Sequence, residues 1–169
     1  MFVFSFARIF SLENLTLDDE AVVWLQSYLQ IDTVNPPGNE SRAVDFYAKI
    51  FEEEGIEFNS AESAPGRGNI WARLKGGDEP ALILLQHTDV VPANMNFWTT
   101  DPFSGEIRDG YIWGRGALDM KGTGISQLAV FLSLHRSGAT LNRDVIFLAT
   151  ADEEAGGAFG AGWIVDNHP

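Results

Sequence analysis

A chain of 169 residues with 45% apolar and 12% aromatic side chains is long enough for one globular domain and too hydrophobic for a disordered chain. The formal net charge of −13 argues against nucleic acid or an anionic membrane as a partner, because both require basic surfaces. Cysteine is absent from the sequence, which excludes disulfides and thiolate ligands, so any metal ion would be held by His, Asp, Glu and water.

The first ten residues, Met1–Phe10, are apolar, but Arg8 interrupts them and no small-residue cleavage site follows. This pattern argues against a signal peptide, and no apolar run reaches the roughly 20 residues that a membrane span needs. We therefore expect a cytoplasmic protein, with secretion as the less favoured alternative. Residues 1–18 are interpreted as an N-terminal extension, and residues 19–169 as the folded part.

Two helices are expected at the start of the folded part. Asp18, Asp19 and Glu20 place negative charge at the first turn of a helix that ends before the loop Asn35-Pro36-Pro37-Gly38-Asn39. The second helix is predicted from apolar side chains at helical spacing, and Gly55 should end it. Those side chains are Ala43, Phe46, Tyr47, Ile50 and Phe51.

Strands follow, and two of them are continuous apolar runs. Residues 56–58 begin extended structure, residues 68–74 alternate like a strand, and residues 106–113 predict a hairpin with an Asp-Gly turn. The runs 81–85 and 145–149 are typical of strands covered on both faces. A long helix is expected from about Thr123 to Arg136, closed by Gly138, and a last helix through Trp163 to Val165.

This order of elements predicts an α/β fold with a mixed, mostly parallel sheet flanked by helices. In such sheets, ligands gather outside the carboxyl ends of the strands. The run 81–85 delivers His87 and Asp89 there, and the run 145–149 delivers Asp152, Glu153 and Glu154.

His87 has two readings. A single histidine after a strand is most often a hydrogen-bonded core or surface residue. Asp89 favours the second reading, because residues two apart on an extended strand point to the same face, so its carboxylate can hold one imidazole nitrogen while the other faces a metal ion.

The carboxylates also have two readings each. Asp119 precedes a helix and is either its N-terminal cap or a carboxylate that bridges two ions. Glu153 and Glu154 are either a solvated helix start or a pair in which one carboxylate binds the metal and the other takes a proton from metal-activated water. The sequence leaves these alternatives open. His135 and His168 are interpreted as non-catalytic, and the tryptophans 98, 113 and 163 as packing residues.

Taken together, several motifs resemble the di-zinc aminoacylase and carboxypeptidase family, whose members include acetylornithine deacetylase, succinyl-diaminopimelate desuccinylase and glutamate carboxypeptidase. The resemblance covers residues 20 to 167 and rests on segments that occur in the family's order. They are Asn35-Pro-Pro-Gly-Asn-Glu40, His87-Thr-Asp89-Val-Val-Pro92, Asp101-Pro-Phe-Ser-Gly105, Gly114-Arg-Gly-Ala-Leu-Asp119-Met-Lys-Gly122 and Asp152-Glu-Glu154-Ala-Gly-Gly157.

The resemblance implies a zinc-peptidase-like catalytic domain and a role for each residue. His87 would bind one zinc ion and Glu154 the other. Asp119 would bridge the two ions, and the peptide bond that follows Asp119 would be cis. Asp89 would orient His87, and Glu153 would be the general base. Family members also supply a further carboxylate ligand, a distant His ligand and a lid domain that dimerises, so this chain is expected to be a truncated N-terminal portion.

The resemblance thus implies a metal-dependent hydrolase of amide or peptide bonds in N-acyl amino acids or small peptides. Two divalent metal ions are expected. Zinc is the favoured metal, and cobalt and manganese are the alternatives. The 169 residues alone are expected to be inactive, and the full-length relative to be a homodimer. The alternatives are an inactive fragment of such an enzyme and a related metallo-aminopeptidase.

Overall fold

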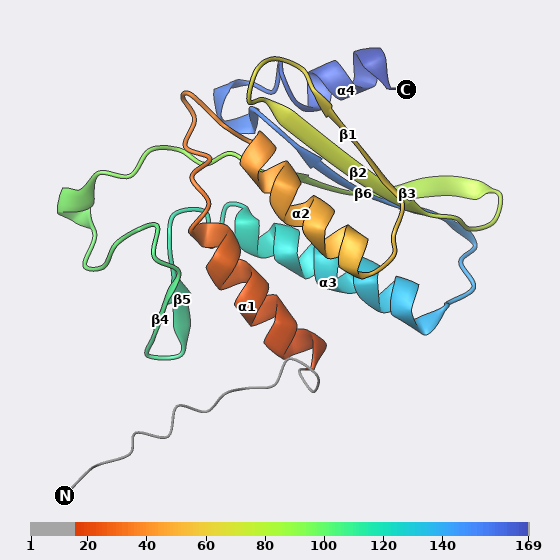
Figure 1. Cartoon of the computed structure of the whole chain (residues 1–169), viewed down its shortest axis with the longest axis horizontal. Coiled ribbons are helices and arrows are strands. Elements are labelled where there is room, and N and C mark those ends of the chain that lie inside the picture. The colour runs from red at the N-terminus through yellow and green to blue at the C-terminus, as the bar shows by residue number, and fades with distance from the viewer. Residues whose placement is uncertain (1–15, 169) are drawn as a thin grey trace, which may run out of the picture.

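The computed structural model describes residues 16–168, and Figure 1 shows a sheet with helices in front of it. The four-stranded sheet has the order β1-β2-β6-β3. Its strands are β1 (Phe58–Glu62), β2 (Gly68–Leu74), β6 (Arg143–Thr150) and β3 (Glu79–His87). The α/β class and the mixed sheet are therefore as predicted.

The strand directions differ from the prediction of a mostly parallel sheet. The β1–β2 and β2–β6 pairs are antiparallel, and of the three strand pairs in this described sheet only β3–β6 is parallel. The reason lies in the connections. A short turn joins β1 to β2 and makes them a hairpin, whereas a parallel pair needs a helical crossover, which α3 (Lys121–Ser137) provides between β3 and β6.

Helices α1 (Leu17–Leu29), α2 (Ser41–Glu53) and α3 cover one face of the sheet and build the core there (Figure 1). Thr16 and Asp19 form a capping box that starts α1, so the helix begins inside the 1–18 segment expected to be an extension. Aromatic rings fill the space between helices and sheet. The largest of these buried rings belong to Tyr28, Tyr47, Phe51, Phe131 and Phe147.

The sequence correctly placed the ends of α2 and α3. Gly55 follows α2 with a φ of +67°, and Gly138 follows α3 with a φ of +62°, the left-handed conformation that glycine adopts without steric cost. The hairpin of β4 (Glu106–Arg108) and β5 (Tyr111–Trp113) turns at Asp109 and Gly110, both with positive φ, as the Asp-Gly pair predicts.

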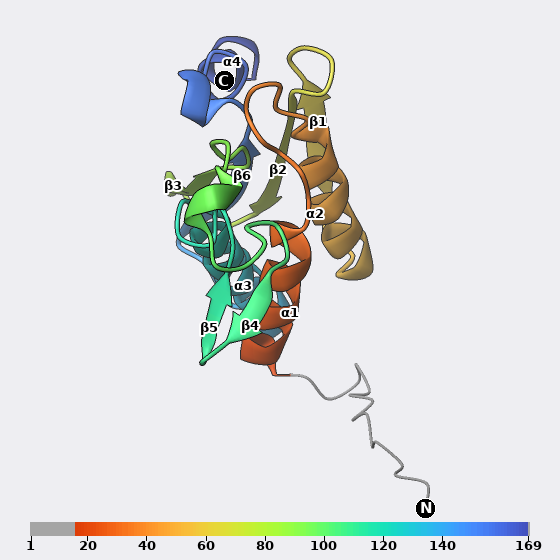
Figure 2. The ribbon, with the colours of Figure 1, turned by 90° about the vertical axis from the view of Figure 1, so that its left-hand side faces the viewer.

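The opposite face of the sheet carries only α4 (Ala161–Asn167) among the described elements, as Figure 2 shows. The expectation that residues 81–85 are covered on both faces is therefore wrong. β3 is an edge strand, and Leu82, Ile83 and Leu85 are 49%, 51% and 46% exposed. A hollow of about 510 Å³ lies beside α4, between Trp71, Ile146 and Leu148 of the sheet and Ile164 of the helix.

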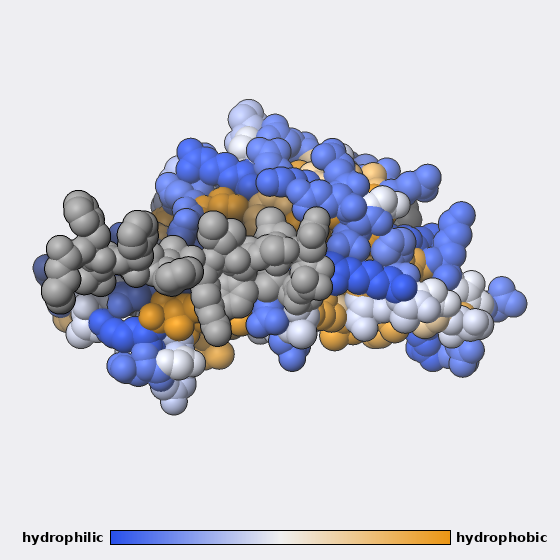
Figure 3. Space-filling view, turned by 60° about the horizontal axis from the view of Figure 1, so that its bottom comes forward, coloured by the Kyte–Doolittle hydropathy of each residue, from blue (hydrophilic) through white to orange (hydrophobic). Residues whose placement is uncertain are grey.

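The surface in a third view is mostly hydrophilic. In Figure 3, hydrophilic residues dominate the visible surface and hydrophobic residues form separate patches. In the part of the chain that the structure describes, no helix is both long and apolar enough to cross a membrane. The prediction about a signal peptide concerns residues outside the described range.

Candidate metal centre

The candidate site lies where the parallel strands β3 and β6 end side by side. His87 is in register with Thr150, and the backbone N–H of Thr88 donates a hydrogen bond of 2.9 Å to the carbonyl of Thr150. The segments that follow, 87–89 and 152–154, therefore emerge at the same edge of the sheet. This is the edge at which the sequence predicted that the ligands would gather.

His87 is 6% exposed and holds its two ring nitrogens in different surroundings. Nδ1 donates to the backbone carbonyl of Asp89 at 3.0 Å and lies 3.4 Å from Oδ1 of its carboxylate. Nε2 lies 3.2 Å from Oδ1 of Asp119 and donates to that carboxylate when the ring is protonated. Because Nδ1 keeps its proton in the bond to the carbonyl, loss of the second proton leaves a lone pair on Nε2, which is the form that binds a metal ion.

Charge around the ring changes its protonation. Burial alone would lower the pKa of His87, but its contacts with the carboxylates of Asp89 and Asp119 outweigh burial and raise the pKa to about 9. The imidazole ring is thus surrounded by negatively charged carboxylates. A cation bound among these groups would replace the proton as the compensating charge.

Asp119 lies directly before α3 but does not cap it. The cap position is Met120, which makes no side-chain capping bond, and the Asp119 side chain is 77% exposed. The peptide bond between Asp119 and Met120 is cis, as the resemblance implied. The structure thus gives no support to the capping interpretation and leaves the carboxylate of Asp119 free to meet His87.

Asp89 is fully buried and anchors the opposite segment. Its carboxylate accepts hydrogen bonds from the backbone N–H groups of Glu153 at 3.0 Å and Glu154 at 3.1 Å, and from Nδ2 of Asn35 at 2.7 Å. Burial would raise the pKa of Asp89, but the contacts with His87, Asn35 and Glu154 outweigh it, and the net shift is downward. One ionised carboxylate therefore connects the two strand ends.

Glu153 and Glu154 occupy the 3₁₀ turn η3 (Glu153–Ala155) and lie in different environments. The Glu153 side chain is 63% exposed, with Oε2 3.7 Å from Nε2 of His87. Glu154 is partly buried, and its pKa is raised by burial and by its neighbours Asp119, Asp89 and Glu153, in spite of the opposing effect of His87.

His87, Asp119 and Glu154 fit a divalent metal ion. Each offers one ligand atom, and these atoms all lie within 4.8 Å of one another. Ligands about 2.0–2.2 Å from a tetrahedral zinc ion are separated by roughly 3.3–3.6 Å, so small side-chain movements would complete the coordination. Imidazole and carboxylate are also donors that zinc, cobalt and manganese accept.

Two buried polar residues behind the site carry little signal in the sequence. Asn35 stands out only as part of a loop and of a family motif, and no sequence pattern points to Arg67. Arg67 donates to Oδ1 of Asn35 at 3.2 Å and pairs with Asp152 and Glu40. No local pattern marks Arg67, because its partners lie far away in the sequence.

Lys121, in the motif after Asp119, points away from the site. Its Nζ donates to the carbonyls of Tyr28 at 3.0 Å and Ile31 at 2.8 Å, and burial lowers the pKa of Lys121 to about 7. The side chain therefore ties the start of α3 to the end of α1.

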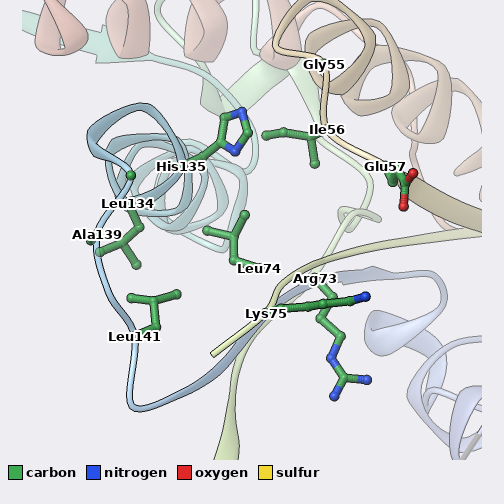
Figure 4. Close-up of a pocket in the computed structure, with 11 residues that line it drawn as sticks. Gly55, Ile56, Glu57, Arg73, Leu74, Lys75, Leu134, His135, Ala139 and Leu141 are labelled. Atoms are coloured by element: carbon green, nitrogen blue, oxygen red, sulfur yellow. The ribbon is translucent and has the colours of Figure 1, made fainter. Parts of the chain in front are cut away.

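A separate pocket of about 470 Å³ lies at the end of the strands opposite to the candidate site, between the turn after α2 and the end of α3 (Figure 4). His135 lines it, and its Nε2 is within 3.1 Å of the carbonyl of Glu54. None of the five predicted site residues lines this pocket. His168 packs between Trp71 and Trp163, with ring centroids 4.9 and 5.1 Å away.

The fold and the cluster define an α/β protein with a candidate metal centre at the carboxyl ends of two parallel strands. The sequence pattern of Peptidase family M20/M25/M40 matches residues 83–169, which include the whole cluster. The chain belongs to this family. The resemblance drawn from the motifs is therefore confirmed.

Named relatives agree with this assignment. The chain is 38% identical over 143 residues to succinyl-diaminopimelate desuccinylase of Methylorubrum populi, covering 81% of this chain and 36% of that protein. It is 36% identical over 141 residues to aminoacylase-1 of Sus scrofa, covering 81% and 34%. The crystal structure of the M20 family metallo-carboxypeptidase Sso-CP2 from Sulfolobus solfataricus superposes with a TM-score of 0.75 at 27% identity, covering 88% of this chain and 34% of that one. The chain thus spans about a third of the length of the relatives it matches.

Proposed function

We propose that this chain carries a metal centre for the hydrolysis of amide bonds in N-acyl amino acids or small peptides. The observation that carries the proposal is the convergence of His87, Asp119 and Glu154, with Glu153 beside them. A hydrolytic metal site needs ligands that leave the ion accessible and a nearby base. This cluster offers both, since the side chains of Asp119 and Glu153 are largely exposed.

Two divalent ions, zinc first, would be held by His87 on one side and Glu154 on the other, with Asp119 between them. When bound, the ions would lower the pKa of a water molecule and polarise the carbonyl of the scissile amide. The exposed carboxylate of Asp119 suits the bridging position, because both its oxygens are accessible. Asp89 would keep His87 in the tautomer that presents Nε2.

Glu153 would be the general base. Its carboxylate projects from the same turn as Glu154 but is not a member of the ligand cluster. It would accept a proton from the attacking water and return it to the leaving amine, as one carboxylate can do in both directions.

The substrate class is supported by the names of the relatives, which include a desuccinylase, an aminoacylase and a carboxypeptidase. A metallo-aminopeptidase is the less favoured alternative.

We further propose a cytoplasmic location and a homodimer for the complete protein. Residues 19–169 would be the N-terminal portion of a catalytic domain. Residues 1–18 would precede it as an extension whose last residues, 16–18, begin α1.

A second candidate function is metal binding without catalysis. Its specific support is that the chain spans about a third of its relatives and that the metal cluster found among residues 16–168 has three ligand residues. Two ions with three protein ligands each would need more than three ligand residues, even if one residue bound both ions.

One experiment separates the two candidates. The purified 169-residue chain is loaded with zinc and incubated with an N-acetyl amino acid, an N-succinyl amino acid and a dipeptide. Turnover that a chelator abolishes and zinc restores supports the hydrolase. Zinc binding without turnover of any of these substrates supports the second candidate for this chain.

A further inference from the structure

A buried polar network lies behind the candidate site and reaches it from the Asn35–Glu40 loop. Asn35 is 6% exposed, and its Nδ2 donates to Oδ2 of Asp89 at 2.7 Å and to Oδ1 of Asp152 at 3.3 Å. A single amide therefore touches a carboxylate at each strand end. Asp89 belongs to the segment after β3, and Asp152 to the segment after β6.

Arg67 fixes this amide from the other side. Its guanidinium donates to Oδ1 of Asn35 at 3.2 Å and to the carbonyl of Pro37 at 2.6 Å, and it forms a short ion pair with Asp152. Both members of that pair are almost fully buried, with side chains 8% and 5% exposed. A planar guanidinium that binds several acceptors at once holds them in fixed relative positions.

The position of Asp152 sets the direction of the chain into Glu153 and Glu154. Asp152 has a φ of +69°, the left-handed region that few residues other than glycine occupy. Every polar group of Asp152 is held. Its N–H donates to Glu40 at 3.2 Å, Oδ2 accepts from the N–H of Phe159 at 3.1 Å, and Oδ1 faces Arg67 and Asn35.

The loop is shaped for this contact. Gly38 has a φ of +106°, and a Cβ atom there would lie 1.8 Å from Nη1 of Arg67. Glycine thus lets the backbone pass against the guanidinium. The loop motif has a physical role that its proline-rich composition alone did not suggest.

We infer that Asn35 and Arg67 form a positioning unit that fixes Asp89 and Asp152 relative to each other and thereby aims Glu153 and Glu154 at the metal centre. The inference rests on the proposed function for its chemical meaning. The unit acts through Asp89, which holds the N–H groups of Glu153 and Glu154, and through the bend at Asp152. Neither Asn35 nor Arg67 belongs to the cluster of candidate ligands.

The test replaces Asn35 by Ala and uses two independent readouts in the full 169-residue chain. Hydrogen exchange of the Glu153 and Glu154 amides, measured by NMR without metal, reports whether Asp89 still holds them. Zinc affinity, measured by calorimetry below the unfolding temperature, reports the consequence for the site. We expect both amides to exchange at least about tenfold faster and zinc to bind about 10–100-fold more weakly, the usual effect of losing a residue that orients metal ligands.

Tyr47→Phe is the matched control. It also removes one buried hydrogen bond, from the Tyr47 hydroxyl to Gln86 at 3.0 Å, but that bond does not involve Asp89 or Asp152. This variant should leave both readouts within about twofold of the unmodified chain. If Asn35→Ala does not fold, Arg67→Lys decides by the same readouts, since it keeps the buried charge and loses the planar fork.

The inference is overturned if Asn35→Ala leaves amide exchange within twofold of the unmodified chain, or if Tyr47→Phe changes it equally. Failure of the proposed function looks different. In that case the unmodified chain does not bind zinc, or binds it without hydrolysing any of the substrates, while the amide measurement still decides whether Asn35 positions this segment.

Discussion

Glu153 and Glu154 are adjacent in the chain, but the structure gives them different surroundings. Glu154 joins His87 and Asp119 in the ligand cluster, whereas the Glu153 side chain is 63% exposed and stays outside it. The two residues therefore differ in the consequence expected from loss of the negative charge. An amide side chain at either position keeps nearly the same size.

In the complete zinc-loaded enzyme, Glu153→Gln should keep zinc affinity within about threefold and lower the hydrolysis rate by about 10²–10⁴-fold, the usual contribution of a general base. The reason is that Gln cannot accept the proton from water. Calorimetry and turnover of an N-acetyl amino acid measure the two effects. Hydrolysis that survives in Glu153→Gln would refute the base assignment. Glu52→Gln, on the exposed surface of α2, is the control for loss of one negative charge.

At the residue scale, local sequence motifs point to three candidate ligands. His87, Asp119 and Glu154 each follow a strand or a turn in a recognisable motif, and the structure brings them together. The role of Arg67 is not predictable from a local pattern, because its contacts with Asn35, Glu40 and Asp152 join residues far apart in the chain. Only the fold shows that these groups are buried together.

At the scale of elements, Arg136 at the end of α3 connects all three helices that cover the sheet. Its Nη1 donates to Glu20 of α1 at 2.6 Å, and its Nε donates to Glu54, just after α2, at 3.0 Å. The hydrogen bond from Arg136 lowers the pKa of Glu54. A lowered carboxyl pKa means that this contact stabilises the fold above the unfolded pKa and loses its effect as pH falls through the folded value.

Arg136→Met should therefore lower the free energy of unfolding at pH 7 by at most about 1 kcal/mol, because the pair is partly exposed to solvent. The difference from the unmodified chain should shrink as the pH falls below 4.5, the ordinary pKa of Glu54. Urea unfolding at pH 7 and pH 3.5 measures it. Arg42→Met is the control, since its partner Asp32 is 3.5 Å away and both side chains are mostly exposed. A difference that grows on acidification would contradict this account.

Periodicity and glycine positions were sufficient to predict most individual elements. Residues 68–74, the Asp109-Gly110 hairpin and the ends of α2 and α3 match the structure. Pairing directions were not predictable in the same way. The antiparallel contact between β2 and β6 joins strands that are distant in the sequence, and no local pattern of side chains specifies its direction.

At the scale of the whole molecule, the two faces of the sheet are unequal. Helices α1, α2 and α3 cover one face, while the other carries α4 and leaves Ile83 and Leu85 about half exposed. A continuous apolar run such as 81–85 predicts a strand buried on both faces, because the sequence alone does not show which elements cover it. In the structure this run forms the exposed edge strand of the described sheet.

An exposed apolar edge favours association between copies of the chain. We expect sedimentation velocity of the 169-residue chain to show concentration-dependent association, and Ile83→Lys to reduce it by placing a charge on that face. Val130→Lys is the matched control, because Val130 is 54% exposed but lies on α3. A monomer at all concentrations, or an equal effect of the two lysines, would refute the prediction.

We propose that His87, Asp119 and Glu154 together hold a divalent metal ion at the carboxyl ends of β3 and β6. Zinc titration by calorimetry tests this, on the unmodified chain and on Glu154→Gln, with Glu52→Gln as the control for charge. We predict saturable zinc binding that Glu52→Gln preserves and Glu154→Gln weakens by at least about tenfold, since one ligand is lost. Absence of zinc binding in the unmodified chain, or equal affinity in all three proteins, would contradict the claim.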